Sequence, residues 1–115
     1  CLAESFVEQV ASSSGRRMVF ISSRMGSIQF NRVGGGYAYR SSKAALNASV
    51  KSISIDLLPR RILVLAIHPG NAKTYPGKGT IELAESVDGI RSLVARANLE
   101  DTGSFLSFDG QPLPW

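Results

Sequence analysis

Two short runs of wholly apolar residues, joined by a helical stretch, most constrain how this chain can fold. The runs are Met18–Ile21 and Ile62–Ile67. Neither alternates apolar with polar residues, which is typical of parallel strands covered by helices on both faces. Between them, residues 37–58 repeat apolar side chains at helical spacing until Pro59, a residue that ends helices. The sequence therefore predicts a right-handed strand–helix–strand unit.

The first eleven residues have the pattern of the end of an amphipathic helix. Leu2, Phe6 and Val10 are four residues apart, so they share one helical face. The chain opens at Cys1 rather than at a methionine, with this pattern already under way. We therefore expect residues 1–115 to be a single partial domain that continues a segment upstream.

Two further elements follow the second apolar run. A loop over residues 71–79 leads to a helical pattern over residues 80–98, which places its apolar side chains on one face. Residues 104–108 then form a last short apolar strand. The resulting order, three strands alternating with helices, predicts an α/β fold with a doubly wound parallel sheet.

Length and composition argue against several classes of protein. A chain of 115 residues suffices for one modest domain. It shows no signal peptide and no apolar run long enough to cross a bilayer. One cysteine, Cys1, and one histidine, His68, cannot build a cysteine- or histidine-based metal site. We expect a cytoplasmic protein with no metal and no membrane partner.

The net charge of +4 is unevenly distributed along the chain. Residues 16–78 hold eleven Lys or Arg residues and a single acid, Asp56. A basic region can attract a phosphate-bearing ligand or nucleic acid. The basic residues, however, form no run of five, and no aromatic residues are interleaved with them on a stacking surface. Scattered surface charge is the better interpretation, and we expect no nucleic-acid partner.

Candidate catalytic residues gather around the loop after the first strand. Ser22 and Ser23 follow that strand directly, and ligands of open parallel sheets bind beyond the carboxyl ends of the strands. Tyr39 and Lys43 are four residues apart in the predicted helix, so they project from one face. A chance pair on an exposed helix face has the same spacing, which leaves both interpretations open.

These residue types suit the reduction of a carbonyl group. Negative charge grows on the carbonyl oxygen as hydride arrives, and a proton must be delivered there. The Tyr39 phenol can supply that proton, and a neighbouring ammonium, Lys43, favours the phenolate that remains. A serine hydroxyl can hold the same oxygen by a hydrogen bond. Hydride itself requires a cofactor, although no G-x-G-x-x-G fingerprint stands between a strand and a helix here.

Taken together and in order, these segments resemble the short-chain dehydrogenase/reductase family. The resemblance rests on FISSRMGSI at residues 20–28, on YAYRSSKAALN at residues 37–47, and on His68-Pro69-Gly70 followed by Thr74. The Gly-rich passage before residue 37 and the ending at residues 105–115 are most similar to the C-factor and sniffer-type carbonyl reductase branch.

The resemblance implies a Rossmann-like sheet and a site for NAD or NADP, of which this branch favours NADP. It implies that Tyr39 is the acid/base, that Lys43 assists Tyr39 and holds the nicotinamide ribose, and that Ser23 rather than Ser22 orients the substrate carbonyl. Further cofactor contacts are implied for Pro69, Gly70, Ala72 and Thr74.

Three features of the family have no counterpart among these residues: its Gly-rich pyrophosphate turn, its coenzyme-selecting residue and its catalytic Asn. The resemblance therefore implies the C-terminal half of an oxidoreductase that transfers hydride between NAD(P)(H) and a carbonyl or secondary alcohol, inactive as an isolated half. The first helix and the Tyr39 helix would form a homo-oligomer. The alternative is a non-catalytic interaction or signalling fragment that uses the same helices. The identity of the substrate stays open.

Overall fold

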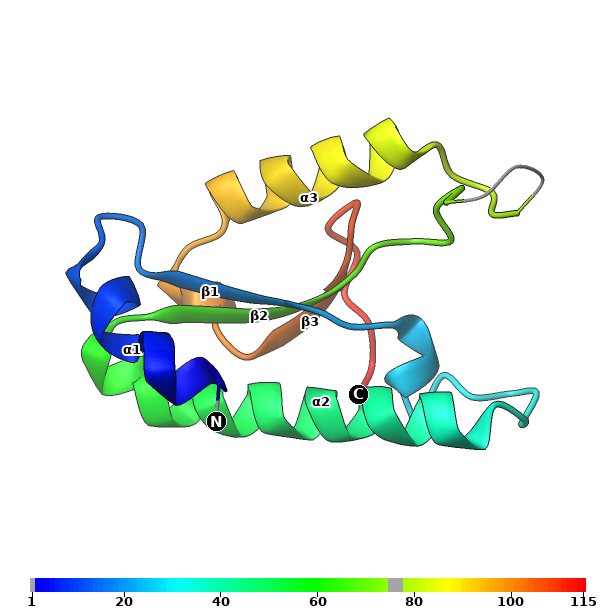
Figure 1. Ribbon diagram of the computed structural model, residues 1–115, viewed down its shortest axis with the longest axis horizontal. Helices are drawn as coiled ribbons and strands as arrows, with labels where there is room; N and C mark the ends of the chain where they lie inside the picture. The colour runs from blue at the N-terminus through cyan, green and yellow to red at the C-terminus, as the bar shows by residue number, and fades with distance from the viewer. Residues whose placement is uncertain (1, 75–77) are drawn as a thin grey trace.

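Three parallel strands form one sheet, and helices cover both of its faces (Figure 1). The computed structural model describes residues 2–74 and 78–115, so Cys1 and the middle of the predicted 71–79 loop lie outside the described residues. The helices and strands in chain order are α1 (Leu2–Ser12), β1 (Arg17–Ile21), α2 (Tyr37–Leu57), β2 (Leu63–His68), α3 (Leu83–Arg96) and β3 (Ser104–Ser107). Three short 3₁₀ helices are η1 (Arg24–Gly26), η2 (Leu58–Arg60) and η3 (Leu99–Asp101).

The strand β2 occupies the centre of the sheet because its side chains are apolar on both faces. Val64 and Ala66 belong to the core on the α2 side, whereas Leu63, Leu65 and Ile67 belong to the core on the α3 side. All five are buried. The strands β1 and β3 pair with β2 on either side, both in parallel. The predicted α/β class and the parallel strand–helix–strand unit are confirmed.

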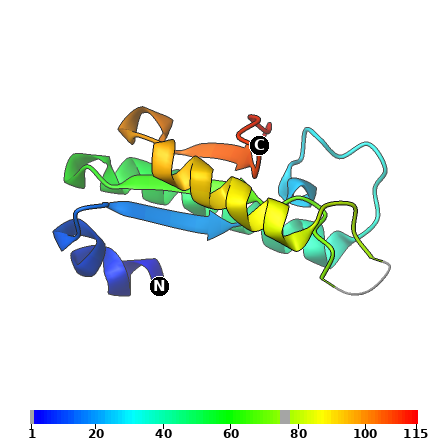
Figure 2. The same ribbon diagram turned by 90° about the horizontal axis from the view of Figure 1, so that it is seen from above.

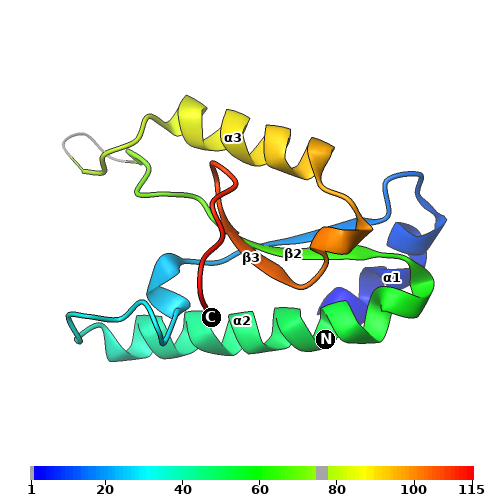
Figure 3. The same cartoon turned by 180° about the vertical axis from the view of Figure 1, so that it is seen from behind.

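The helices divide between the two faces of this sheet. α2 runs under one face with α1 beside it, and α3 runs over the other (Figures 1 and 3). Val50 of α2 is completely buried, and Leu93 of α3 is nearly so. Seen from above, α3 crosses the sheet with β1 at one edge and β3 at the other (Figure 2). None of the helices in residues 2–74 and 78–115 has the length and apolar character that crossing a membrane requires.

The helix α3 is shorter than the predicted span of residues 80–98 because both ends take part in other structure. Ile81 forms a parallel bridge with Ala72, which keeps the residues before Leu83 extended. At the other end, Asn98 caps η3: its side chain accepts a hydrogen bond from a backbone N–H of that turn, and its own N–H bonds to Asp101. The helical periodicity thus extends beyond the residues that form helical hydrogen bonds.

The strand β1 has one unpaired edge. Among the described residues it is hydrogen-bonded to β2 alone, and Ile21 at its end is 48% exposed. A strand whose N–H and C=O groups lack partners on one side is a template for another strand.

Candidate active site

The chain turns from β1 into η1 in a way that presses this turn against α2 (Figure 1). Ser23 begins η1 as its N-cap, and its Oγ accepts a hydrogen bond of 3.1 Å from Met25 N. Gly26 ends η1 so close to α2 that an added Cβ would lie 2.8 Å from backbone atoms of Lys43. Glycine is therefore what allows η1 to contact the helix that carries Tyr39 and Lys43.

The two serines after β1 have different partners. Ser22 Oγ donates a hydrogen bond to Asn47 Oδ1 of α2, and both side chains are buried. Ser22 N also bonds to Ile67 O at 2.8 Å, which extends the sheet ladder by one residue. The Ser23 hydroxyl, by contrast, accepts from η1 and donates to no acceptor in the part of the chain that the structure describes. Of these two serines, Ser23 is the one whose hydroxyl proton has no acceptor within the described residues and can be donated to a ligand.

The structure brings Tyr39 and Lys43 together and directs the lysine towards β1. Lys43 Nζ lies 5.9 Å from the centroid of the Tyr39 ring. The same ammonium donates a hydrogen bond of 3.2 Å to Ile21 O, at the end of the strand that leads into Ser23. Tyr39 is 49% exposed. The predicted shared face of this pair is thus observed, and its lysine reaches the strand end beside the serines.

Four residues that the resemblance assigned to the cofactor lie in the loop after β2: Pro69, Gly70, Ala72 and Thr74. This loop leaves the sheet at the same edge as Ser23 because β1 and β2 are parallel. Pro69 O accepts a hydrogen bond from Ser86 of α3. Gly70 has a φ of 79°, and an added Cβ there would lie 2.5 Å from the side chain of Ile81. The start of the loop is therefore held against α3 and the residues before it.

His68, the last residue of β2, is a partly buried base next to this edge. Burial lowers the pKa of His68, the positive charge of Arg24 lowers it further, and Asp109 opposes both effects. Its Nδ1 is buried and has no hydrogen-bond partner among the described residues. In the same residues, no group of three or more side chains is arranged to hold a metal ion.

This lowered pKa predicts a loss of stability in mild acid. The unfolded chain has an ordinary histidine pKa of about 6.5, so it binds more protons than the folded chain as the pH falls through that value. We expect the urea midpoint to fall between pH 7 and about pH 5.5, a range in which carboxylates remain ionised. The His68→Gln variant should show a flatter profile. An equally steep decline in that variant would contradict the assignment to His68.

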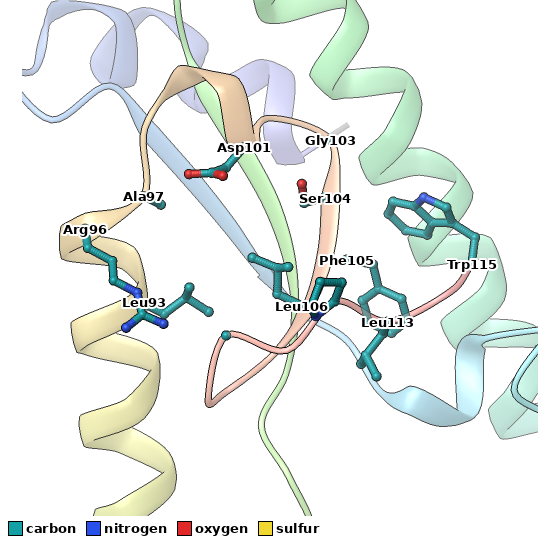
Figure 4. Close-up of a pocket in the computed structure, with 12 residues that line it drawn as sticks. Leu93, Arg96, Ala97, Asp101, Gly103, Ser104, Phe105, Leu106, Leu113 and Trp115 are labelled. Atoms are coloured by element: carbon teal, nitrogen blue, oxygen red, sulfur yellow. The ribbon is translucent and has the colours of Figure 1, made fainter.

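A separate hollow of about 620 Å³ lies between the end of α3 and β3 (Figure 4). Arg96 and Leu93 approach it from α3, and Leu106 approaches it from β3 (Figure 4). Phe105 and Trp115 also line it, and their rings stack with centroids 5.3 Å apart. None of the predicted site residues lines this hollow, so it is distinct from the candidate site.

Comparisons with known proteins identify the family of this chain. Residues 1–106 match the family model described as short chain dehydrogenase. The C-signal of Myxococcus xanthus is 41% identical over 102 residues, which cover 87% of this chain and 61% of that protein. The carbonyl reductase Sniffer of D. melanogaster superposes with a TM-score of 0.89 and 35% identity, over 99% of this chain and 51% of that one.

An NADPH-bound carbonyl reductase from chicken fatty liver superposes with a TM-score of 0.88 and 29% identity, over 99% of this chain and 51% of that one. The chain thus spans about half the length of the proteins it matches. The family model covers most of these residues, and both superpositions include all three parallel strands. The chain belongs to the short-chain dehydrogenase family.

Proposed function

We propose that Ser23, Tyr39 and Lys43 form the proton-transfer site of a nicotinamide-dependent carbonyl reductase. The observation that carries this proposal is the position of Lys43 Nζ between the Tyr39 ring and Ile21 O. Tyr39 donates a proton to the substrate oxygen, and the adjacent Lys43 assists this transfer. Ser23 donates a hydrogen bond to the same oxygen and orients the carbonyl group.

A nicotinamide cofactor fits the donors present at this edge of the sheet. An ammonium has three donors, and Lys43 uses one of them on Ile21 O, which leaves two for the ribose hydroxyls. The loop after β2 would line the nicotinamide ring through Pro69, Gly70, Ala72 and Thr74. When bound, the cofactor supplies the hydride. NADP is the coenzyme we favour over NAD.

The described residues form, in this proposal, the C-terminal half of a nicotinamide-binding domain. The unpaired edge of β1 supports this, because a strand of the other half would cover it. The length of the two carbonyl reductases that superpose on it, about twice that of this chain, supports it as well. The contacts to the cofactor pyrophosphate would come from the other half, so the isolated residues would be inactive. The complete enzyme would assemble as a homo-oligomer.

The two serines provide the test of this proposal. In the protein that carries this chain, Ser23→Ala should lower kcat for ketone reduction by about 10²- to 10³-fold, because a hydrogen bond to the developing oxyanion is lost. Ser22→Ala should instead lower the free energy of unfolding by roughly 1–3 kcal/mol, because it leaves the Asn47 amide buried without that partner. Absorbance of NADPH and urea unfolding measure the two effects.

The control is the unmodified protein with NADPH and a ketone. Carbonyl-dependent oxidation of NADPH is the expected result. Its absence, or an equal loss of turnover in both serine variants, would contradict the assignment.

A second candidate is a non-catalytic interaction or signalling function that uses α1 and α2. Exposed apolar side chains on these helices favour it: Leu2 is 78% exposed, Phe6 is 53% exposed and Ile55 is 62% exposed. The NADPH oxidation assay described above distinguishes the two candidate functions. A protein that self-associates but neither binds NADPH nor reduces a ketone fits only the second candidate.

A further inference from the structure

Three arginines surround a small hollow next to the candidate active site. The hollow has a volume of about 300 Å³ and lies between the loop after β1 and the start of α2. One guanidinium comes from η1, one from the loop and one from the first turn of α2, and three apolar side chains complete the wall. The six lining residues are Arg24, Met25, Phe30, Arg32, Val33 and Arg40.

The loop around this hollow is held in one shape by its own hydrogen bonds. Phe30 N donates to Ser27 Oγ at 3.0 Å, and Gly34 N donates to Asn31 Oδ1 at 3.0 Å. Arg40 Nε donates to a loop carbonyl at 3.0 Å and so fixes the end of the loop to α2. Hydrogen bonds within the loop, and between the loop and α2, therefore define the walls of the hollow.

The three arginines of this hollow have no carboxylate partner in the part of the chain that the structure describes. Arg24 instead lies over the Phe30 ring, 5.3 Å from its centroid. Asp56, the one acid in residues 16–78, stands sixteen positions along α2 from Arg40, about 24 Å at the helical rise. The N-terminal turn of α2 also lacks an acidic residue and a side-chain cap. An anion is the ligand such a hollow favours.

The hollow and the proposed catalytic residues adjoin one another in the fold. Arg24 directly follows Ser23, and Arg40 directly follows Tyr39, with consecutive Cα atoms about 3.8 Å apart. The charge of Arg24 also reaches His68 at the carboxyl edge of β2, where it contributes to the lowered pKa. The hollow and the Ser23–Tyr39 pair therefore lie on the same two segments, the η1 turn with its N-cap and the first turn of α2.

We propose that this hollow binds an anionic group of the substrate, so that the enzyme reduces carbonyl compounds that carry a carboxylate or a phosphate. The proposal rests on the proton-transfer role of Ser23 and Tyr39. The oxygens of the anion would accept hydrogen bonds from the guanidiniums. Phe30 and Val33 would cover the methylene groups that join the anion to the carbonyl.

Arg32 is the residue to change, because its guanidinium donates no hydrogen bond within the described residues, whereas Arg40 holds the loop. The substrates are adipic semialdehyde, its neutral methyl ester and glyceraldehyde phosphate, with NADPH and the protein that carries this chain. At least one anionic aldehyde should exceed the ester in kcat/KM by about 10- to 100-fold. Arg32→Gln should reduce that preference by about tenfold, because the loss falls mainly on the anionic aldehyde. The control Arg91→Gln, on α3 outside the hollow, should not change this preference.

Three results would overturn the proposal: no preference for either anion, an equal loss with ester and acid in Arg32→Gln, or a rise in the KM for NADPH alone. The relative rates with carboxylate and phosphate identify which anion is preferred. Calorimetry with adipate, which has no reducible carbonyl, gives a readout independent of turnover. If no aldehyde is reduced, the proposed function fails, and adipate binding that weakens in Arg32→Gln still supports the anion site. Adipate binding that is absent or equal in both proteins overturns it.

Discussion

Replacement of Tyr39 by phenylalanine should lower kcat for ketone reduction by about 10²- to 10⁴-fold, the usual contribution of a general acid. The change removes the phenol oxygen and keeps the ring beside Lys43. The free energy of unfolding should change by less than about 0.5 kcal/mol, because Tyr39 is half exposed and its hydroxyl has no hydrogen-bond partner in the described residues. Single-turnover absorbance of NADPH and urea unfolding measure the two quantities.

Tyr37 provides the matched control for this change. It lies on the same helix, two residues earlier and therefore on a different face, and it is 83% exposed. Tyr37→Phe should keep its full turnover. Unchanged turnover in Tyr39→Phe, or a similar loss in both variants, would refute the role of Tyr39.

Replacement of Gly26 by alanine should damage both stability and activity. The added Cβ would lie 2.8 Å from the backbone of Lys43, and a backbone inside a helix has little freedom to move away. η1 would have to shift from α2, at a cost of about 1–3 kcal/mol in the free energy of unfolding. The shift would also displace Ser23 from Tyr39, and a misplacement of about 1 Å can reduce turnover by about 10²-fold.

Gly15→Ala is the control, because the nearest atom to its added Cβ is the flexible end of Arg17 at 3.9 Å. We expect its urea midpoint and its turnover to match those of the parent protein. If Gly26→Ala behaves in the same way, the contact between η1 and α2 does not position the site.

The sheet could be predicted from the sequence because β2 must be apolar on both faces to occupy its centre. The predicted strand Ile62–Ile67 is observed at Leu63–His68. Ile62 is fully buried but precedes the strand, directly after Arg61 with its positive φ of 54°. His68 joins the strand because it pairs with Ser107, a partner that hydropathy does not reveal.

The 3₁₀ turn η1 could not be predicted from periodicity, because three residues form less than one period of a helix. Its local signals were the serine at its N-cap and Gly26 at its end. Why this glycine is required became clear only from α2, whose Lys43 backbone lies against it. Sequence patterns describe neighbours along the chain better than contacts between elements.

In the candidate site, too, contacts along one helix could be predicted from the sequence and contacts between elements could not. The proximity of Tyr39 and Lys43 followed from helix geometry, since residues four apart share a face. The different surroundings of Ser22 and Ser23 depend on Asn47, which lies 25 residues from Ser22 in the sequence. The sequence patterns therefore did not identify Asn47 as the buried side chain that accepts the hydrogen bond of the Ser22 hydroxyl. The arginine-lined hollow was missed for a similar reason, because its three guanidiniums come from three separate segments.

The most direct measurement is the position of a ketone oxygen in a crystal structure of the protein that carries this chain, with oxidised nicotinamide cofactor and the unreacted ketone bound. The proposed mechanism predicts that this oxygen lies within about 2.6–3.2 Å of both Tyr39 Oη and Ser23 Oγ, with Lys43 Nζ beside the ribose. A ketone oxygen bound away from both hydroxyls, with Tyr39 facing solvent, would contradict it.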